Sequence, residues 1–504
     1  MSTDTPLEAV LIGAGQRGAE AYAPYALQHP DQLVFTAVAE PLADRRERFA
    51  AAHNIPPERC FSSWEELLSS RSTAQAAVIA TQDALHAAPA IAAMRTGHHV
   101  LLEKPIAVTL SDCEALIKVS EQTGRQLHVC HVLRYTRHMR LMREIIQSGV
   151  IGEVIDVDHR ENVAFWHMAH SYVRGNWGVQ AQSGPMILTK CVHDLDILPW
   201  LLDRKPLHLS SSGGLTHFRP ENAPEGAPDR CTDGCPAAET CPYYAPHLYL
   251  GLEPFWHSYA ETAAKGLPRW AAKKAADQPG LVRLLGKVYP PLRQISEYRG
   301  WPLTVAAQDP TPENLLEALL TGPYGRCVYH CGSDVVDHQV VSMQFEGGAT
   351  VTLTMHGHSP VEHRSTRIEG TRGRLMAQLG NGGSWIDVEL HRPQRRMHYD
   401  TSAAPQEGHG GGDSQLMAEF AASARAGGNP PEVQAAARAA LQAHRLAFLA
   451  EQARVEGVVI QLDKGGGENL QKIPGIHKHK DRKEAKPGKK ESKKKSNHES
   501  KKRG

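Results

Sequence analysis

The stretch EAVLIG at 8–13, continued as GAGQRG at 13–18, decides the fold of this 504-residue chain. A helix-forming segment follows at 19–28, and the β-branched run LVFTAVAE at 33–40 ends in Glu40. Glycines permit a tight turn and a close backbone approach to a pyrophosphate, whose charge is stabilised at a helix N-terminus. A carboxylate at the end of the second strand can accept hydrogen bonds from a ribose. The pattern therefore predicts a dinucleotide-binding Rossmann unit.

The glycine turn and the acid beyond it also indicate which dinucleotide binds. We expect the turn to contact the cofactor through Gly13, Gly15, Gln16, Arg17 and Gly18. Glu40 favours NAD, because its carboxylate would repel the 2′-phosphate of NADP. Arg45 and Arg46 follow closely and leave NADP open, although an exposed helix face explains this pair more simply.

Apolar runs and helix-forming segments continue to alternate up to residue 133. The runs AAVIAT at 76–81, HHVLLEKP at 98–105 and QLHVCHVL at 126–133 are typical of buried strands. Right-handed crossovers between such strands predict a doubly wound parallel sheet. Ligands bind at the carboxyl ends of these strands, so Thr81 and the run from Glu103 to Pro105 should face the cofactor.

The composition hides two unlike parts. The chain holds 56 Lys+Arg and 55 Asp+Glu, but residues 476–504 alone hold 13 basic and 4 acidic residues, which leaves 43 and 51 for the rest. An acidic body argues against nucleic-acid binding by that part. No run of about 18 apolar residues occurs, and the N-terminus lacks a basic region or cleavage site, so we expect a cytoplasmic protein without a membrane span. In that compartment the nine cysteines should stay reduced.

Five sequence features of the chain are characteristic of one protein family. They are GAGQRG at 13–18, Glu40, IAT at 79–81 followed by His86, EKPIA at 103–107 and HDLD at 193–196. With them the chain resembles the Gfo/Idh/MocA family, named for glucose–fructose oxidoreductase, inositol dehydrogenase and a rhizopine-catabolism protein. The resemblance covers residues 7–462 and adds Thr81, His86, Glu103 and Lys104 to the expected cofactor contacts.

The resemblance implies both an architecture and an activity. It implies an NAD-binding Rossmann domain at 1–130 and a substrate-binding α/β domain at 131–462, whose large sheet is mostly antiparallel. It also implies an NAD(P)-dependent oxidoreductase that acts on a CH–OH group of a sugar or cyclitol. Members of the family usually form homo-oligomers packed through these large sheets, so we expect one here.

The resemblance places the family's catalytic lysine on Lys104. Burial and repulsion by a cationic nicotinamide would lower its pKa, which suits proton transfer at neutral pH. The family's second motif, Asp-x-x-x-His, is matched by His193, but Thr189 stands where the aspartate is expected. Lys190 could fill that space, because residues 190 and 193 share one face of a helix. His193 would then act as acid or base beside a cation; the alternative is a histidine with local hydrogen bonds only.

A polar and aromatic cluster lies between the two motifs. Sugars bind by stacking on aromatic faces and by bidentate polar groups, and this segment supplies both kinds of side chain. Any single member is more simply structural, so we expect about half of them to line the substrate pocket. The candidates are Arg134, Tyr135, Glu161, Trp166, His167, His170, Arg174 and Trp177, with His131 beside them.

Three cysteines crowd one loop, in the pattern Cys231-x3-Cys235-x5-Cys241. Cys327, or Cys331 as the alternative, could supply a fourth ligand. Four thiolates suit a tetrahedral zinc ion, while an iron–sulfur cluster, free thiols and disulfides are the alternatives. We expect a structural role, in which the metal ties the insertion at 219–320 to the sheet.

The remaining third of the chain predicts the large sheet, two helices and a tail. Four runs between 335 and 393 alternate with short glycine-containing turns, which is typical of antiparallel strands. Asp337 and His338 in the first run favour cross-strand contacts over catalysis. The Lys-rich segment 463–504 has too few apolar residues to fold and predicts a disordered tail. Its charge could contact a polyanion, although a solvated extension is the simpler explanation.

Four helix signals complete the prediction. They are the capping boxes Ser63-x-x-Glu66 and Ser111-x-x-Glu114 and the helix-forming stretches at 413–427 and 430–454.

Three functions fit these observations. The first is an NAD-dependent oxidoreductase in which Lys104 or His193 takes a hydroxyl proton while hydride leaves the sugar. The second is an NAD-dependent glycosidase that oxidises C3 transiently, so that the acidified C2 hydrogen and the glycosidic group are eliminated. The third is a sugar or nucleotide sensor without catalysis. Fold alone does not separate them.

Overall fold

Strands from the first 130 residues form a six-stranded sheet. The computed structural model describes residues 5–70, 73–262, 266–380, 383–402, 408–462 and 468–472. The strands β1 (Leu7–Ile12), β2 (Leu33–Ala39), β3 (Cys60–Phe61), β4 (Ala76–Ile79), β5 (His99–Leu102) and β6 (Leu127–Val129) lie in the order β3-β2-β1-β4-β5-β6. All their pairings are parallel. The order reverses between β1 and β4, which leaves a crevice at their carboxyl ends. The predicted Rossmann sheet is confirmed.

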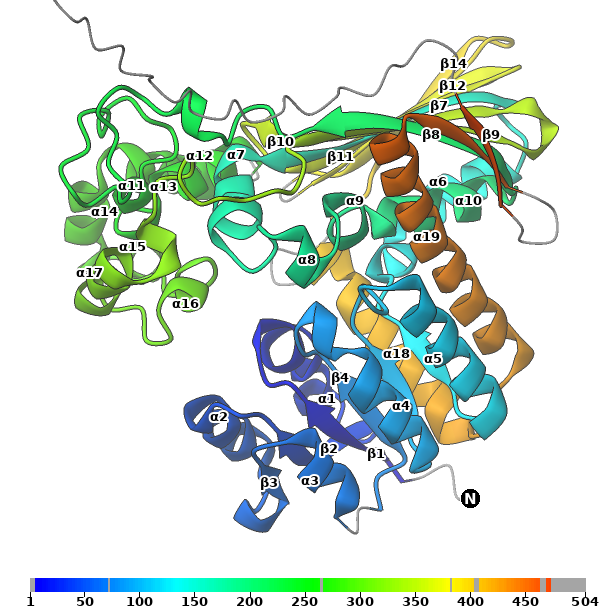
Figure 1. Cartoon of the computed structure of the whole chain (residues 1–504), viewed down its shortest axis with the longest axis horizontal. Helices are drawn as coiled ribbons and strands as arrows, with labels where there is room; N and C mark the ends of the chain where they lie inside the picture. Colours follow the sequence, from blue (N-terminus) through cyan, green and yellow to red (C-terminus); the bar gives the residue numbers. More distant parts are fainter. Residues whose placement is uncertain are drawn as a thin grey trace, which may run out of the picture. The chain divides into compact units, whose positions relative to one another are not determined.

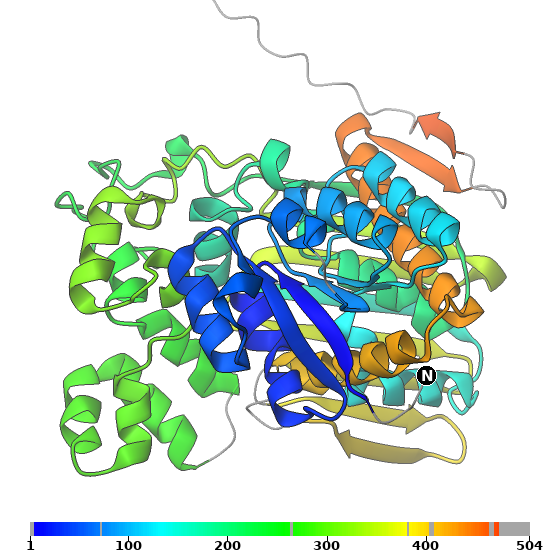
Figure 2. The ribbon, with the colours of Figure 1, turned by 90° about the horizontal axis from the view of Figure 1, so that it is seen from below.

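Helices cover both faces of this sheet, and the last two return from the far end of the chain (Figures 1 and 2). One face packs on η1 (Gln16–Tyr22), α1 (Pro24–Gln28), α2 (Ala43–His53) and α18 (Gly412–Ala426). The other face packs on α3 (Trp64–Ser69), α4 (Ala87–Arg95), α5 (Leu110–Thr123) and α19 (Pro431–Glu456). Because both faces are buried, the strands are apolar throughout rather than alternating.

The two capping boxes have different outcomes. Ser63 Oγ accepts a hydrogen bond from the backbone N–H of Glu66 at 3.2 Å, so the start of α3 is confirmed. The prediction at Ser111 is wrong, because α5 begins at Leu110 with Thr109 as its N-cap. The Thr109 hydroxyl accepts from the N–H of Asp112 at 3.2 Å and donates to its carboxylate at 2.6 Å. Thr109 and Asp112 have the same spacing as the predicted box, two residues earlier in the chain.

A ten-stranded, mostly antiparallel sheet forms the second half of the structure, as predicted. Its strands are β7 (Val154–Ala164), β8 (Pro206–Gly214), β9 (His338–Phe345), β10 (Thr350–Ser359), β11 (His363–Gly370), β12 (Gly373–Gly380), β13 (Trp385–Leu390), β14 (Arg395–Asp400), β15 (Val458–Leu462) and β16 (Glu468–Lys472). They lie in the order β14-β13-β12-β11-β7-β10-β9-β8-β15-β16, and β7 pairs with β10 in parallel. The sequence analysis did not identify β7, because VIDVDHRENVA carries charged residues on a strand that lies inside the sheet.

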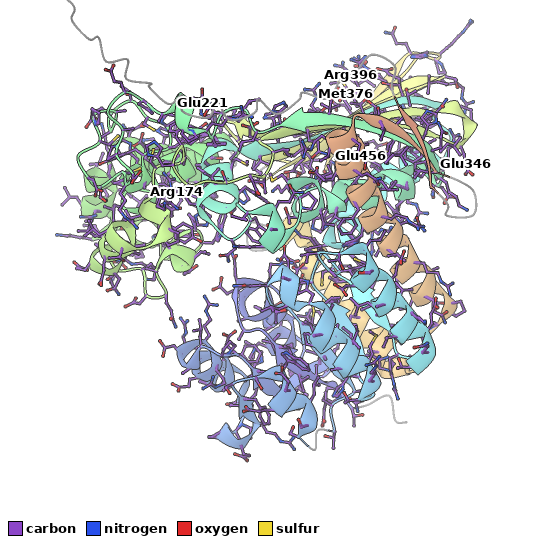
Figure 3. All side chains as sticks on the ribbon, in the orientation of Figure 1. Arg174, Glu221, Glu346, Met376, Arg396 and Glu456 are labelled. Carbon is purple, nitrogen blue, oxygen red and sulfur yellow. The ribbon has the colours of Figure 1, made fainter. Side chains whose placement is uncertain are left out.

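Helices pack on one face of the large sheet, and side chains such as Met376 and Arg396 are exposed on the opposite face (Figure 3). The covering helices α6 (Arg137–Gln147), α10 (Val192–Leu202) and α19 share one core with the strands. Short helical segments connect these elements: α7 (Phe165–His167), the π-helical η5 (Met168–Arg174), α8 (Gln180–Ser183) and α9 (Met186–Thr189). They carry the second set of candidate site residues.

The predicted insertion is a set of short helices with a core of its own (Figure 1). They are α11 (Ala245–Tyr249), α12 (Glu253–Thr262), α13 (Leu267–Asp277), α14 (Pro279–Gly286), α15 (Pro290–Ser296), α16 (Leu303–Ala306) and α17 (Pro312–Thr321). Trp166 belongs to the same core, so the insertion packs directly against α7.

The end of the chain follows the prediction only in part. The strand β16 pairs with β15 and extends the sheet to Lys472, past the residue 462 at which we expected the folded part to end. The rest of the predicted tail, residues 463–467 and 473–504, lies outside the described residues, so its predicted disorder stays a prediction. Within the described ranges no helix is both long and apolar enough to cross a membrane.

Candidate active site

Two of the three glycines in the turn after β1 are required by packing, and the third leaves room for a ligand. Gly13 has φ of +94°, and a Cβ there would lie 2.7 Å from the carbonyl oxygen of Ala80. A Cβ on Gly18 would lie 2.1 Å from the carbonyl of Gly13. At Gly15 the nearest atom to a Cβ is Nη1 of Arg45, at 3.8 Å. The turn therefore packs tightly against β4 and stays open above Gly15, which fits a pyrophosphate at the following helix.

Glu40 lies at the end of β2 and faces this turn. Its carboxylate accepts hydrogen bonds from the backbone N–H groups of Ala14 at 2.9 Å and Leu42 at 3.1 Å. Arg46 donates to the Glu40 carbonyl at 2.5 Å, and the side chain of Gln16 is exposed. A carboxylate oxygen accepts more than one hydrogen bond, so Glu40 retains acceptor capacity for a ribose hydroxyl.

Arg17 binds to the protein itself. Its guanidinium donates to Glu103 at 2.5 Å, to Asp413 of α18 at 2.7 Å and to the Tyr22 hydroxyl at 2.6 Å. Burial alone would raise the pKa of Glu103, but the charges of Arg17 and Lys104 outweigh it and hold that pKa below its usual range. Arg17 and Glu103 thus fix the glycine turn to the end of β5. Asp413, almost 400 residues away in sequence, was missed because no local pattern marks it.

Lys104 lies at the carboxyl end of β5, at the centre of the candidate site. Its ammonium donates to the carbonyl oxygen of Thr189 at 2.8 Å, and its backbone N–H donates to Glu103 at 2.5 Å. Burial lowers the pKa of Lys104, and the nearby carboxylates of Glu103 and Asp83 offset this only in part. The Lys190 cation lowers it further. A lysine with a lowered pKa can exchange a proton closer to neutral pH than an ordinary lysine.

Asp83, a residue that was not predicted, lies near the charges of Lys104 and His86 and contacts the predicted residue Trp177. The buried His86 ring contacts the carbonyl oxygens of Thr81 at 3.1 Å and Pro105 at 2.6 Å, so it ties the end of β4 to the EKP run. Trp177 donates its indole N–H to Asp83 at 2.8 Å. Burial raises the pKa of Asp83, although His86 and Lys104 oppose the shift. Asp83 has no motif of its own and was found only from its position in the fold.

Lys190 takes part in a second charged cluster. Its ammonium lies 2.6 Å from Glu362 and 3.4 Å from the fully buried Glu161. Burial alone would lower the pKa of Lys190, but these two carboxylates outweigh it and raise the pKa well above its usual range. Glu362 also pairs with His167. We expected Lys190 to place a cation near His193 where the family has a carboxylate; in the structure the charge of Lys190 is balanced by two carboxylates.

His193 lies on α10, three residues after Lys190 in sequence and close to His131. The two imidazole rings are 5.7 Å apart and edge to face. The His193 side chain is buried, with 7% of its surface exposed. The next residue, Asp194, pairs with Arg364 at 2.7 Å and His159 at 2.9 Å, so the start of α10 is held firmly against the sheet.

The structure divides the predicted substrate residues into those near the lysines and those held elsewhere. His167, Glu161 and Trp177 contact the groups around Lys104 and Lys190. Arg134 forms two 2.6 Å hydrogen bonds with Asp196, and the ring of Tyr135 lies under Arg140. His170 pairs with Tyr249 at 2.8 Å, and burial lowers its pKa to about 3. These internal contacts use the polar atoms that a sugar would need.

One aromatic residue at this site was not foreseen. Trp301, from the insertion, lies with its ring 5.0 Å from His167, 5.3 Å from Trp166 and 5.6 Å from His170. The insertion therefore contributes an aromatic wall beside the Lys190 cluster. Its sequence gave no signal, because a tryptophan in a long loop is more often explained by packing.

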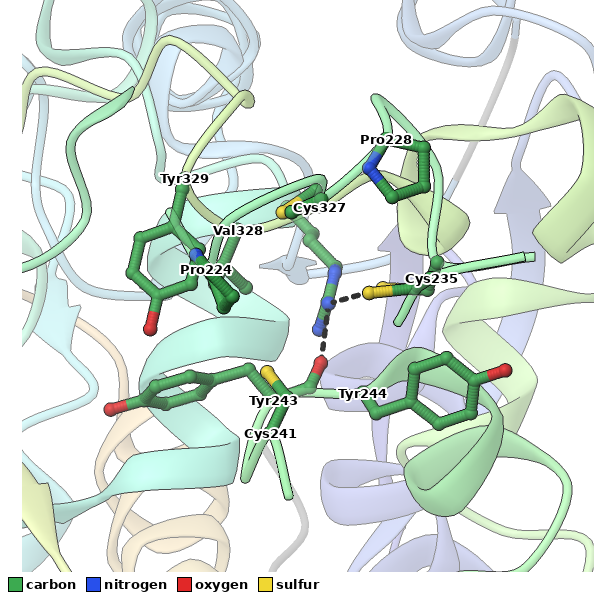
Figure 4. Close-up of a pocket in the computed structure, with 12 residues that line it drawn as sticks. Pro224, Pro228, Cys235, Cys241, Tyr243, Tyr244, Cys327, Val328 and Tyr329 are labelled. Atoms are coloured by element: carbon green, nitrogen blue, oxygen red, sulfur yellow. Dashed lines mark hydrogen bonds between the residues drawn. The ribbon is translucent and has the colours of Figure 1, made fainter. Parts of the chain in front are cut away.

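Arg174 and the loop cysteines come together around one cavity (Figure 4). Figure 3 labels Arg174 on the ribbon. Arg174 donates to the carbonyl oxygens of Arg326 at 2.8 Å and Tyr243 at 2.6 Å, and it faces the thiol of Cys231 at 3.6 Å. The predicted metal ligands Cys231, Cys235, Cys241 and Cys327 line one narrow cavity, and all are free thiols. Among the described residues, no group of three or more histidine, cysteine, aspartate or glutamate side chains is placed so that it could hold a metal ion without rearrangement.

A Rossmann sheet with an open glycine turn and a lysine at the end of β5 defines a nucleotide-dependent oxidoreductase. Two family models match the chain. The model of the oxidoreductase family with an NAD-binding Rossmann fold covers residues 7–131, and that of the Gfo/Idh/MocA C-terminal domain covers residues 139–232. Residues 7–131 and 139–232 are the Rossmann domain and part of the C-terminal domain of a Gfo/Idh/MocA oxidoreductase, as the resemblance predicted, and the first of them is an NAD(P)-binding domain.

Three relatives show the range of this similarity. YteT of Bacillus subtilis is 22% identical over 355 residues, which cover 68% of this chain and 71% of YteT. The 2,7-anhydro-N-acetylneuraminate hydratase of Escherichia coli is 29% identical over 42% of this chain and 54% of the enzyme. The 1,5-anhydro-D-fructose reductase of Ensifer adhaerens is 31% identical over 34% and 51%. The matched region spans about half the length of the last two relatives.

Solved structures share the fold over most of the chain. An aldose–aldose oxidoreductase from Caulobacter crescentus, complexed with glycerol, has a TM-score of 0.57 at 15% identity and covers 91% of this chain and all of its own. An oxidoreductase from Agrobacterium radiobacter, in complex with NAD+, L-tartaric acid and magnesium, has a TM-score of 0.58 at 15% identity and covers 91% and 98%. At this identity the similarity establishes the fold.

The ion pairs of Arg17 predict that the variant Arg17→Met is less stable than the wild type, by an amount that depends on pH. At neutral pH the variant should lose about 3 kcal/mol of stability, because the carboxylates of Glu103 and Asp413 stay buried without their cation. The folded-state pKa of Glu103 is lowered, so its contribution is present at neutral pH and fades as the pH falls below about 4. Melting temperatures of both proteins across this range should therefore converge on acidification. The exposed Arg283→Met is the control, and a gap that is constant with pH would contradict the prediction.

Proposed function

We propose that the protein is an NAD-dependent dehydrogenase that oxidises a CH–OH group of a sugar or cyclitol, or reduces the corresponding ketone. The observation that carries the proposal is Lys104, held at the carboxyl end of β5 by the Thr189 carbonyl with its pKa lowered by burial. The relatives named for a reductase and a hydratase of anhydro sugars support a carbohydrate substrate. NAD is favoured over NADP, because Glu40 would repel a 2′-phosphate.

The chain's own residues divide the work in this proposal. Bound NAD would supply the hydride acceptor, held by the glycine turn, Glu40 and the ends of β4 and β5. Lys104 in its neutral form takes the proton of the substrate hydroxyl, and as ammonium it returns the proton in the reverse direction. His193 is the second candidate for this transfer.

The second charged cluster and the insertion would bind the rest of the sugar. Lys190 stays protonated between Glu161 and Glu362 and offers a fixed cation with oriented acceptors beside it. His167 and Trp301 add aromatic surface next to these groups. Aromatic faces and charged hydrogen-bonding groups together are what a polyhydroxylated ring requires.

Lys104→Met tests the proton-transfer role. Oxidation of a panel of sugars and cyclitols, followed by NADH absorbance, should identify a substrate for the wild type, and kcat/KM on it should fall by about 10²–10⁴ in the variant. Dinucleotide affinity, measured by fluorescence titration, should fall much less than kcat/KM, because the turn after β1 and Glu40 hold the pyrophosphate and the ribose. The exposed Lys118→Met is the matched control. A variant that keeps most of the wild-type rate would show that Lys104 does not transfer the proton.

Asp83→Asn tests the electrostatic setting of Lys104. The Asp83 carboxylate raises the pKa of Lys104, so its removal should lower that pKa further. Oxidation needs the neutral amine, and the rate rises with pH through the lysine pKa. The rising limb of the pH–rate profile should therefore move to lower pH in the variant. The amide oxygen that replaces the carboxylate can still accept the hydrogen bond from Trp177. Asp31→Asn, on the surface, should leave the profile in place; a limb that moves to higher pH would contradict the assignment.

A second candidate function, an NAD-dependent elimination on a glycoside, is favoured by one comparison and one feature of the site. The relative from Escherichia coli is named as a hydratase, and His167, held by Glu362 beside the Lys190 cation, supplies a further candidate acid or base. Incubation with nitrophenyl glycosides separates the two candidates. Aglycone release without matching NADH formation would overturn the simple dehydrogenase; no release, with NADH formed from free sugars, would overturn the elimination.

A further inference from the structure

We propose that the protein binds one structural zinc ion through Cys231, Cys235, Cys241 and Cys327. The first three come from one loop and the fourth lies more than 80 residues further along the chain. The fold brings all four to a single cavity that is lined otherwise by proline, aliphatic and tyrosine side chains and by Arg174 (Figure 4). A cysteine often packs as a small apolar residue, but such packing does not require four thiols from two distant segments to surround one cavity.

Backbone hydrogen bonds hold the two cysteine segments in register without any metal. The N–H of Cys231 donates to Gly325 at 2.9 Å, and the N–H of Cys327 donates to Asp229 at 2.8 Å. A short antiparallel bridge joins Arg230 and Arg326 between them. The thiols therefore sit on a scaffold whose main chain is already in place, and ligation requires movement of the side chains.

The size of the cavity favours a single ion. The cavity measures about 10 Å³, close to the room that one water molecule needs. A cuboidal iron–sulfur cluster holds several iron and sulfide atoms and would not fit without displacing the walls. Zinc bound to four thiolates needs only Zn–S distances of about 2.3 Å, which rotation of the thiols into the cavity can provide.

Arg174 gives an independent electrostatic argument. Its side chain is buried, and none of the carboxylates in the described ranges forms an ion pair with it; it faces Cys231 and two carbonyl oxygens instead. A buried cation without a counter-ion is costly. On binding Zn²⁺ each thiol releases its proton to solvent, and the four thiolates and the ion together carry a charge of −2. Arg174 would then lie beside an anionic centre and donate a hydrogen bond to it.

The geometry also selects Cys327 over Cys331. Cys327 lines the cavity, whereas the thiol of Cys331 is turned to the carbonyl oxygen of Cys327 at 3.3 Å. The loop from residue 223 to 244, between a short 3₁₀ turn and α11, contains no helix or strand. A metal crosslink would stabilise this irregular segment, so we assign it a structural role.

Metal analysis of the full chain, expressed without a histidine tag, tests the proposal. We expect about one zinc per chain in the wild type and less than about 0.3 in Cys231→Ser/Cys235→Ser and in Cys327→Ser. Cys331→Ser and Cys60→Ser should keep the metal. His477→Ala/His479→Ala should keep it as well, which separates the site from the histidines of the tail.

Cobalt substitution in the wild-type protein gives a second test, which does not depend on whether the cysteine variants fold. Wild-type protein grown with Co²⁺ should show the thiolate-to-cobalt charge-transfer and visible bands of a tetrahedral tetrathiolate site, and a mercurial should release zinc in proportion to thiols titrated. Less than about 0.3 metal per chain after loading under reductant would overturn the proposal. So would iron with inorganic sulfide, cysteines found as disulfides, or full zinc content in the Cys327→Ser protein.

Discussion

The buried ion pair of Arg17 with Glu103 and Asp413 joins the three parts of the chain that build the candidate site. Arg17 comes from the glycine turn, Glu103 from the end of β5 and Asp413 from the start of α18. Breaking a buried pair leaves an uncompensated charge, which is one of the more costly defects in a protein. The turn therefore cannot change position without disturbing both the EKP run and the returning helix. The cofactor surface is rigid for this reason, before any ligand binds.

A second link joins the Rossmann sheet to the rest of the chain through its backbone. The Lys104 ammonium reaches the Thr189 carbonyl, and the backbone N–H of Ile106 donates to the buried His444 of α19 at 2.8 Å. Burial lowers the pKa of His444 to about 3, so this imidazole stays neutral and can accept the bond. The lysine is thus placed between two halves of the chain by contacts on either side of it. Substitutions at Thr189 preserve its carbonyl, which explains how the chain can lack the family's aspartate there and still hold Lys104.

The sequence predicted features that depend on neighbouring residues, and it failed where distant segments meet. The glycine turn and Glu40 were foreseen, because a dinucleotide site requires small residues and an acid at fixed spacings. EKP was foreseen because it ends an apolar strand and matches the family's motif. Arg174 was expected among substrate residues, but its partners Tyr243 and Arg326 lie about 70 and 150 residues away. The error at Ser111 is similar, although it concerns neighbouring residues. Thr109 and Asp112 offered an equivalent capping box, and only the packing of α5 selects between the two possible helix starts. The catalytic and binding roles themselves remain proposals that the substitutions above address.

The two lysines of the site show how one residue type acquires two roles. Lys104 and Lys190 are both desolvated, which lowers the pKa of each. Lys190 has two carboxylates, the nearer at 2.6 Å, and their attraction exceeds the cost of burial. Lys104 has a carbonyl oxygen as its closest partner, and a neutral acceptor stabilises an ammonium much less than an anion does. Each lysine also repels the other's charge, so the one that is firmly protonated keeps its neighbour ready to lose a proton. The two environments thus shift the two lysine pKa values in opposite directions. Lys104 can then transfer a proton while Lys190 provides a fixed positive charge in the same pocket.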